Sequence, residues 1–458
     1  MDLAELKKYN RIHLIGIGGI SMSAIAETLH NWGFTVTGSD ISQSQITDTL
    51  VEHGIEVTIG HDLVNSKKAD LIIFSAAISD TDPEILIANE NHIRLVGRGE
   101  FVGYLTKMYN ETICISGTHG KTTTTSLLSI CFINDHKDPS IEVGAILNQI
   151  GGNYRVGNSD YFILESCEYK ENFLKFFPNT AIVLNIDNDH LDYYKNLENI
   201  IKAFKKFASI VDPSGLLVVN ADDKNCLDLK NDTKAKFLSY GIDNQDANFV
   251  AKNISFDKEG YPSFDVYKNG ELYDSYSLSI TGRHNVLNAL ACITVCDYYN
   301  LNKNVVKESL GSFTGAGRRL EYKGTINDNV KIYDDYAHHP TEIAAVANAV
   351  KNKTYNQSWV VFQPHTYSRT KELLSDFAKA ISNFDNVILV DIYAAREKNT
   401  FNISSEDLKN EIIKNGHQAE YIPNFNDVVS YLKNNVSPND IIITLGAGTV
   451  TDIGPMLL

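Results

Sequence analysis

Short apolar runs rich in β-branched residues recur along the chain, and stretches with helical spacing of apolar positions lie between them. Continuous apolar runs of this length are typical of strands that are buried on both faces of a parallel sheet. The runs expected to be strands are 12–15, 35–38, 70–75, 112–116, 161–164, 181–186, 216–220, 330–333, 360–364, 387–391 and 441–445. Because strands and helices alternate, the pattern predicts an α/β protein with mostly parallel sheets.

The segment Gly117-Thr118-His119-Gly120-Lys121-Thr122-Thr123 stands between the predicted strand 112–116 and a predicted helix. A glycine turn before a helix N-terminus leaves free backbone N–H groups that bind phosphate. Lys121 is placed to reach the terminal phosphates of a nucleotide, and Thr122 to offer its hydroxyl to Mg²⁺. The strict P-loop pattern has another glycine where Ile115 stands, so this is a shortened variant. The alternative is an ordinary strand-to-helix turn with a surface lysine.

The same pattern suggests how the chain is divided. Between 247 and 280 the runs become short and alternate with polar residues, which predicts an antiparallel patch. A length of 458 residues suits about three domains. We expect a Rossmann-like first domain (1–107), a central P-loop ATPase domain (108–314) and a Rossmann-like C-terminal domain (315–458).

A second glycine turn, Gly16-Ile17-Gly18-Gly19-Ile20-Ser21, follows the first strand and precedes a helix predicted over 22–32. Asp40 follows the next strand, as an acidic residue does in dinucleotide-binding folds, although Ser21 replaces the last glycine of that fingerprint. The functional interpretation places a pyrophosphate on 18–21 and a ribose hydroxyl near Asp40. The alternative is tight packing without a ligand.

Two polar residues follow strands of the predicted central sheet. Glu165 ends the strand 161–164, and His190 lies just after the strand 181–186. Ligand sites of open parallel sheets lie beyond the carboxyl ends of the strands, so both residues could meet the phosphates and hold metal. The alternatives are a solvated strand end for Glu165 and a packed or capping role for His190.

The last third carries several charged clusters. Gly315-Ala316-Gly317-Arg318-Arg319 is either a hinge whose arginine closes onto phosphate or a solvated basic linker. The segment Asp334-Asp335-Tyr336-Ala337-His338-His339-Pro340-Thr341-Glu342 follows the strand 330–333, and two acids and two histidines lie in its first six residues. This cluster could bind a divalent metal, but we favour a loop that faces the ATP cleft.

Charge and cysteine content narrow the function classes. A net charge of -16 argues against nonspecific binding to nucleic acid or to an anionic membrane. The six cysteines form no Cys-x-x-Cys pair, and they fit a reducing compartment. The N-terminus shows no apolar signal segment and no run is long enough to span a bilayer, so we expect a cytoplasmic protein.

With these motifs in order, nearly the whole chain resembles the Mur ligases, which add amino acids to the nucleotide-linked precursor of bacterial peptidoglycan. The ATP loop 117–123 is specific to this family and the related folylpolyglutamate synthases. The N-terminal glycine turn, the segment 334–342 and Gln363-Pro364-His365-Thr366-Tyr367-Ser368-Arg369 are most similar to the ligases that act first in the series. Two positions depart from the family pattern: Thr366 stands where an arginine is common, and Ala337 where many relatives have glycine.

The resemblance implies binding residues for each reactant. Those implied for ATP are Gly117, Thr118, His119, Gly120, Lys121, Thr122, Thr123, His284, Asn285, Arg319, Asp334 and Asp335. Those implied for the UDP-linked substrate are Gly16, Gly18, Gly19, Ile20, Ser21, Asp40, Ser75, Arg98 and His119. The incoming amino acid would lie among Tyr336, His338 and Arg369.

The resemblance also implies metal and catalytic roles. Thr122 and Glu165 would hold one Mg²⁺ and His190 a second, while Lys121, His190 and Arg319 would be catalytic. The implied activity is ATP-dependent joining of L-alanine to the lactyl carboxylate of UDP-N-acetylmuramate through an acyl phosphate. The C-terminal domain would close and exclude water, and the protein would be a monomer or a weak homodimer.

Three other functions are alternatives for this sequence. A recycling ligase that attaches a whole tripeptide to the same acceptor is the nearest of them. The first glycine turn alone would suit an NAD-dependent dehydrogenase, but the ATP loop argues against this. A non-enzymatic P-loop switch would leave the first glycine turn unexplained.

Overall fold

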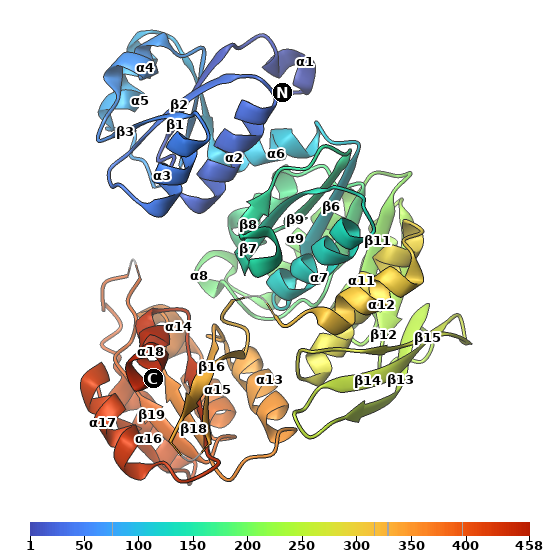
Figure 1. Ribbon diagram of the computed structural model, residues 1–458, viewed down its shortest axis with the longest axis vertical. Helices are drawn as coiled ribbons and strands as arrows, with labels where there is room; N and C mark the ends of the chain where they lie inside the picture. Colours follow the sequence, from blue (N-terminus) through green and yellow to red (C-terminus); the bar gives the residue numbers. More distant parts are fainter. Residues whose placement is uncertain (76, 316, 328, 396) are drawn as a thin grey trace. The chain divides into compact units, whose positions relative to one another are not determined.

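The structure is a computed structural model that describes residues 1–75, 77–315, 317–327, 329–395 and 397–458 (Figure 1). Its residues separate into two units, which are described one at a time. Unit 1 comprises Met1–Tyr240 and Ala291–Val306, and unit 2 comprises Gly241–Leu290 and Lys307–Leu458.

Unit 1 begins with a parallel five-stranded sheet in the order β3-β2-β1-β4-β5. Its strands are β1 Arg11–Ile15, β2 Thr35–Asp40, β3 Glu56–Ile59, β4 Leu71–Phe74 and β5 Arg94–Gly97. Its helices are α1 Leu3–Leu6, α2 Ile20–Asn31, α3 Gln45–Glu52, α4 Leu63–Lys68, α5 Pro83–Glu90 and α6 Arg98–Thr106.

Both faces of this sheet are covered. Leu71 and Ile73 of β4 belong to the hydrophobic cluster that includes Ile25 of α2, whereas Ile72 between them belongs to the cluster that includes Ile85 of α5. Alternate residues of a strand point to opposite faces, so a continuous apolar run is what a strand between two helical layers requires.

The second sheet of unit 1 runs in the order β12-β11-β10-β6-β9-β7-β8. Its strands are β6 Glu111–Ser116, β7 Ser140–Leu147, β8 Gly152–Arg155, β9 Tyr161–Glu165, β10 Thr180–Val183, β11 Leu216–Asn220 and β12 Lys236–Gly241. Its helices are α7 Lys121–Asn134, α8 Leu191–Tyr194, α9 Leu197–Ser209 and α10 Lys224–Leu227. β7 and β8 are antiparallel and the other neighbouring strands are parallel, so the site-bearing ends of β6, β9 and β10 lie at one edge.

Unit 2 contains an antiparallel group of strands, β13 Phe249–Phe256, β14 Pro262–Lys268 and β15 Glu271–Ser277. Its other sheet runs in the order β16-β17-β21-β18-β19-β20 and is parallel except for β16. These strands are β16 Glu321–Ile326, β17 Val330–Asp335, β18 Ser358–Phe362, β19 Asn386–Leu389, β20 Ala419–Tyr421 and β21 Ile441–Leu445.

Helices flank the parallel sheet of unit 2: α13 Pro340–Lys351, α14 Tyr367–Glu372, α15 Leu374–Ile381, α16 Ser405–Lys414, α17 Phe425–Asn435 and α18 Ile453–Leu457. Two further helices, α11 Arg283–Tyr298 and α12 Lys303–Ser312, each contain residues of both units.

The predicted secondary structure is confirmed in type and order, with small differences at the ends. The run 181–186 is a strand only as far as Val183, because its last residues turn into the phosphate-binding region. The antiparallel patch predicted over 247–280 is present as β13 to β15.

The core of unit 1 extends beyond the first sheet. Phe101 and Leu105 of α6 belong to the same buried cluster as two residues of the following segment. These are Phe173, which follows β9 of the second sheet, and Phe204 of α9. The first 107 residues therefore share a hydrophobic core with the segment that follows them. The domain boundaries at 107/108 and 314/315 stay a prediction.

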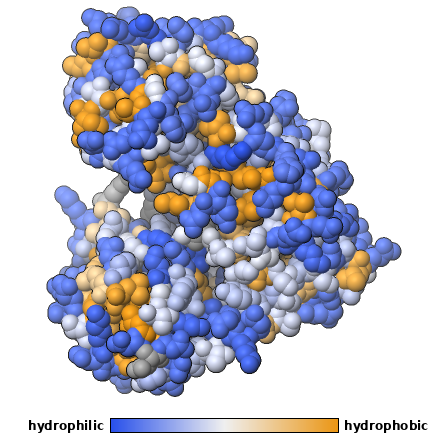
Figure 2. Space-filling view, viewed as in Figure 1, coloured by the Kyte–Doolittle hydropathy of each residue, from blue (hydrophilic) through white to orange (hydrophobic). Residues whose placement is uncertain are grey.

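The surface carries no sign of a membrane span in the described residues. None of their helices combines the length and the apolar character that crossing a bilayer requires. Hydrophilic residues cover most of the face shown in Figure 2, and hydrophobic residues form separate patches on it.

Candidate active site

The loop between β6 and α7 has the backbone geometry of a phosphate-binding turn. Gly120 adopts a left-handed conformation (φ 84°) as the residue that caps α7. Gly117 has a φ of 140°, and a Cβ built on it would lie 3.0–3.1 Å from Leu184 and Asn185. A side chain at Gly117 would thus strain the backbone and push the neighbouring strand end away.

The side chain of Asn185 makes two hydrogen bonds with this loop. Its Oδ1 accepts a hydrogen bond from the His119 N–H at 2.7 Å, and its Nδ2 donates to the His119 carbonyl at 3.0 Å. These two hydrogen bonds fix the backbone of the loop at His119. Thr118 adds a second contact, since its hydroxyl accepts a hydrogen bond from the Asp187 N–H at 2.9 Å.

Lys121 lies folded over the loop. Its ammonium donates to the carbonyls of Gly117 and Thr118 at 2.5 and 3.0 Å, and it pairs with Glu168 at 3.0 Å. Only 2 % of the Glu168 side chain and 13 % of the Lys121 side chain are exposed. Burial alone would lower the pKa of Lys121, but the neighbouring groups, Glu168 foremost and then Cys167 and Glu165, together outweigh burial, and the pKa is raised. The loop thus keeps a fixed, fully charged cation.

The predicted metal pair Thr122 and Glu165 is brought together. The Thr122 hydroxyl donates to Oε2 of Glu165 at 2.9 Å, and the Gly144 N–H donates to the same oxygen at 2.9 Å. A hydroxyl and a carboxylate are the hard oxygen ligands that Mg²⁺ prefers. The donor set therefore fits a magnesium ion beside the phosphate loop.

His190 lies beside Glu168. It precedes α8 with a φ of 53°, its Nε2 is 3.6 Å from Glu168 Oε1, and its ring packs on Tyr169 at 4.6 Å between centroids. The carboxylate of Glu168 thus faces both Lys121 and His190.

The N-terminal glycine turn gathers the residues expected to hold the UDP-linked substrate. Gly18 donates its N–H to Asp40 Oδ2 at 2.9 Å, and a Cβ built on Gly16 would lie 3.1 Å from the Ser75 side chain. Gly19 caps α2, and Ile20 is 56 % exposed at its start. An anion at this helix N-terminus would meet free backbone donors.

Ser21 connects this turn to the second sheet. Its hydroxyl donates to Glu142 Oε1 at 2.5 Å and accepts from Arg98 Nη1 at 3.0 Å. Burial raises the pKa of Glu142, while Ser21 and the Arg98 charge oppose the rise. The serine that replaces the third fingerprint glycine thus links the N-terminal glycine turn to Glu142 of β7.

In unit 2, Asp334 and Asp335 have different hydrogen-bond partners. Asp334 is fully buried; its Oδ2 accepts from Arg318 Nε at 2.9 Å and its Oδ1 from the Thr444 hydroxyl at 2.6 Å. Asp335 accepts from the N–H groups of Ala337 and Leu320 at 2.8 and 2.7 Å. Burial raises the pKa of Asp335 to about 6, although the Arg319 charge and both N–H donors oppose the rise.

Arg318 makes an ion pair with Asp334. The guanidinium groups of Arg318 and Arg319 lie 5.1 and 5.4 Å from the centre of the Tyr336 ring. His284 and Asn285 lie in the first turn of α11, where the Asn285 amide donates to the Thr281 carbonyl at 2.8 Å. Ala316 of the predicted hinge lies outside the described residues.

The three residues predicted around the amino acid form one group. The rings of Tyr336 and His338 are 5.4 Å apart, those of His338 and His365 are 5.6 Å apart, and Arg369 Nη1 is 3.3 Å from His365 Nδ1. Thr366 begins α14 with a φ of 66°. The group offers a cation and two imidazoles beside an aromatic ring, which suits a small zwitterion.

Two residues of the site, Asn185 and Glu168, were not predicted from the sequence. Asn185 was part of a predicted strand, and Glu168 follows β9 at the third position after Glu165, where no motif marks it. Both residues lie just after parallel strands next to the loop. Because ligand sites lie beyond such strand ends, this position could have marked both residues as candidates.

Three family models match the chain in succession. They are the Mur ligase family catalytic domain over residues 11–110, the Mur ligase middle domain over 115–296, and the Mur ligase glutamate ligase domain over 318–448.

Curated relatives match over the full length. A UDP-N-acetylmuramate–L-alanine ligase of Acetivibrio thermocellus is 45 % identical over 458 residues, which is 100 % of this chain and 97 % of the relative. A ligase of the same name from Clostridium novyi is 47 % identical over 459 residues, covering 100 % of this chain and 99 % of the relative.

Solved structures show the same fold. A UDP-N-acetylmuramate–alanine ligase of Thermotoga maritima matches with a TM-score of 0.79 and 29 % identity, covering 98 % of both chains. A murein peptide ligase of Psychrobacter arcticus matches with a TM-score of 0.69 and 23 % identity over 98 % of both chains, which shows the fold alone.

Proposed function

The chain belongs to the Mur ligase family, and from this premise we propose that it joins L-alanine to the lactyl carboxylate of UDP-N-acetylmuramate at the expense of ATP. The observation that carries the proposal is full-length identity of 45 % to a ligase of that name. The α/β fold with mostly parallel sheets that the sequence predicted is confirmed by the structure and by the Thermotoga relative.

The reaction needs activation because a free carboxylate is a poor electrophile toward an amine. ATP would transfer its γ-phosphoryl group to the lactyl carboxylate, giving an acyl phosphate and ADP. The amine of L-alanine would then attack the acyl carbon, and inorganic phosphate would leave. The ammonium group of L-alanine must lose one proton before its nitrogen can attack and a second as the amide forms, and a base of the site must accept one of the two.

Phosphoryl transfer brings two anions together, so fixed positive charge is the main requirement. Lys121 supplies it in the loop, where Glu168 holds the ammonium in place and charged. We assign Arg319 to the γ-phosphate, His284 and Asn285 to the adenine, and Asp334 or Asp335 to the ribose, as the family resemblance implies.

Mg²⁺ is assigned to Thr122 and Glu165, which are 2.9 Å apart through their oxygens, and a second ion to the region of His190 and Glu168. When bound, the ions neutralise phosphate charge. The first glycine turn, with Asp40, Ser75 and Arg98, is assigned to the UDP-linked substrate.

We propose that the amino-acid site is formed by Tyr336, His338 and Arg369. We further propose that the enzyme works in the cytoplasm, as a monomer or a weak homodimer, on small molecules alone.

A substrate comparison tests the proposed function against the recycling alternative. Purified protein with ATP, Mg²⁺ and UDP-N-acetylmuramate receives L-alanine in one reaction and L-alanyl-γ-D-glutamyl-diaminopimelate in another, at equal concentrations. Mass spectrometry of the UDP-linked product measures the rate of each reaction. We expect the amide with L-alanine to form much faster than the amide with the tripeptide. Faster ligation of the tripeptide would make the recycling reaction the function of this chain.

A further inference from the structure

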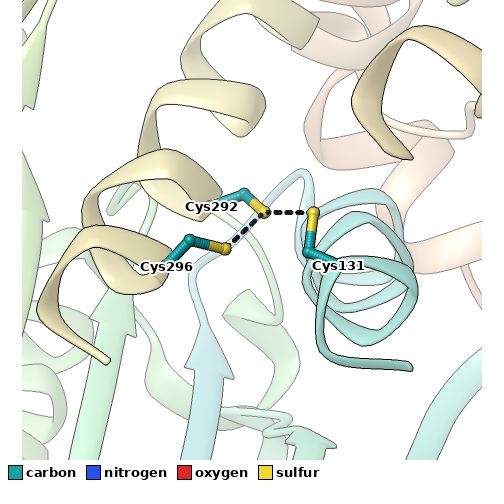
Figure 3. Close-up of side chains that lie close together, drawn as sticks. All are labelled: Cys131, Cys292 and Cys296. Carbon is teal, nitrogen blue, oxygen red and sulfur yellow. Dashed lines mark hydrogen bonds between the residues drawn. The ribbon is translucent and has the colours of Figure 1, made fainter. Parts of the chain in front are cut away.

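Three cysteine side chains converge inside unit 1, away from the strand ends that form the proposed active site. Cys131 lies near the end of α7, and Cys292 and Cys296 lie on α11 (Figure 3). The sulfur of Cys292 is 3.7 Å from that of Cys131 and 3.8 Å from that of Cys296. All three sulfurs lie within 4.8 Å of one another.

The arrangement follows from helix geometry. Cys292 and Cys296 are four residues apart, so they lie on one face of α11, one turn apart. The two helices pack so that Cys131 of α7 meets this face, as Figure 3 shows. The exposed fractions are 0 % for Cys131 and Cys292 and 2 % for Cys296. All six cysteines lie among the described residues, and none forms a disulfide.

The sulfur spacing is that of a thiolate metal site. A Zn²⁺ ion binds thiolate at about 2.3 Å in tetrahedral geometry, which separates its sulfur ligands by about 3.8 Å. Two of the three edges of the cluster already have this length. The third edge needs at most a small side-chain rotation to reach it.

We propose that Cys131, Cys292 and Cys296 form a binding site for a thiophilic d¹⁰ divalent cation such as Zn²⁺, distinct from the magnesium sites. The three sulfurs are soft ligands, which select Zn²⁺-like ions over Mg²⁺. A bound ion would fasten the body of α7, whose N-terminus carries Lys121 and Thr122, to α11.

Metal binding would change the charge of the cluster. A thiol that coordinates the ion releases its proton to solvent and becomes a thiolate. The negative thiolates around the ion reduce the cost of burying its charge in an apolar interior.

The test uses Cd²⁺ as a spectroscopic probe on the full chain, purified in reduced, metal-free form. The exposed Cys167 lies beside Glu168 and could bind the probe, so it is replaced in every protein by Cys167→Ser. We expect one Cd²⁺ per chain with a sulfur-to-metal charge-transfer band in the ultraviolet. X-ray absorption at the cadmium edge should show three sulfur neighbours.

Two variants in that background separate the cluster from other thiols. Adding Cys296→Ala should abolish the band, whereas Cys226→Ala, at a buried cysteine outside the cluster, should leave it unchanged. A band that is missing in the parent protein, or that persists with Cys296→Ala, overturns the proposal.

A second readout uses the Cys167→Ser protein alone and needs no substitution in the cluster. If alkylation of the buried thiols needs local opening that releases the ion, Cd²⁺ at 100 times its Kd should slow alkylation about 100-fold. Peptide mass mapping should show this slowing at Cys131, Cys292 and Cys296 and not at Cys114 or Cys226. Equal slowing at all five, or none, contradicts the assignment.

Discussion

Lys121 and Glu168 form a buried ion pair at the phosphate loop, so replacing the lysine alone has two separable effects. Lys121→Met removes the fixed cation of the loop, and it also leaves Glu168, only 2 % exposed, without its partner. Breaking a buried pair by removing one partner costs about 3–5 kcal/mol of stability. Losing a preorganised charge contact to the transition state costs about 2.7–4 kcal/mol, a factor of roughly 100 to 1,000 in rate.

A second substitution separates the two effects. In Lys121→Met/Glu168→Gln the unpaired carboxylate is gone, so most of the lost stability should return. The rate should stay low, because the cation is still absent. Urea denaturation followed by circular dichroism measures stability, and phosphate release in the presence of UDP-N-acetylmuramate and L-alanine measures turnover.

The same lysine-to-methionine change at an exposed pair provides the control. Lys202 pairs with Glu198 on α9, where 60 % and 75 % of the side chains are exposed, and Lys202→Met should leave stability and turnover unchanged. Near-normal turnover of Lys121→Met would refute the role of the lysine. Recovery of turnover in the double variant would show that the single variant had failed through misfolding and not through lost charge.

Other consequences of the site can be measured separately. Glu165→Gln should raise the Mg²⁺ concentration needed for half-maximal rate; an unchanged Mg²⁺ titration would remove Glu165 from the metal site. Gly18→Val would place its Cβ 2.9 Å from Asp40 Oδ2 and should weaken binding of UDP-N-acetylmuramate in calorimetry while sparing ATP. Gly152→Val is the control, because a Cβ there would meet only the Tyr154 carbonyl, at 4.0 Å. Selective loss of ATP binding would reverse the assignment of the two loops. The pKa of Asp335 is about 6 in the folded protein against 3.8 as its ordinary value, so the folded state binds more protons between these values. The unfolding free energy should therefore fall by at most about 3 kcal/mol as the pH rises from about 4 to 6, and Asp335→Asn should lose this slope; a wild-type slope that Asp335→Asn leaves unchanged would contradict the shift.

Sequence patterns predicted the fold well where the strands are buried on both faces, as β10, β11, β18 and β21 are. The run at 71–73 is continuous since alternate residues enter the two cores, and that signal is local and strong. The phosphate loop was equally predictable, because glycines with positive φ and an adjacent lysine have a fixed spacing.

The rest of the site depends on contacts between segments far apart in the chain. Asn185 clamps His119 across 66 positions, and Glu168 reaches Lys121 across 47. Neither contact leaves a periodic or local pattern. Ser21 stands where the glycine fingerprint has its last glycine. It makes hydrogen bonds with Glu142 and Arg98 that no spacing rule predicts.

The central claim is that a carboxylate is activated by phosphorylation and then captured by L-alanine. Label both oxygens of the lactyl carboxylate of UDP-N-acetylmuramate with ¹⁸O and run the reaction to completion with ATP and L-alanine. The acyl-phosphate route predicts that one labelled oxygen appears in each inorganic phosphate released, as read by mass spectrometry. Amide formation with unlabelled phosphate would contradict the account.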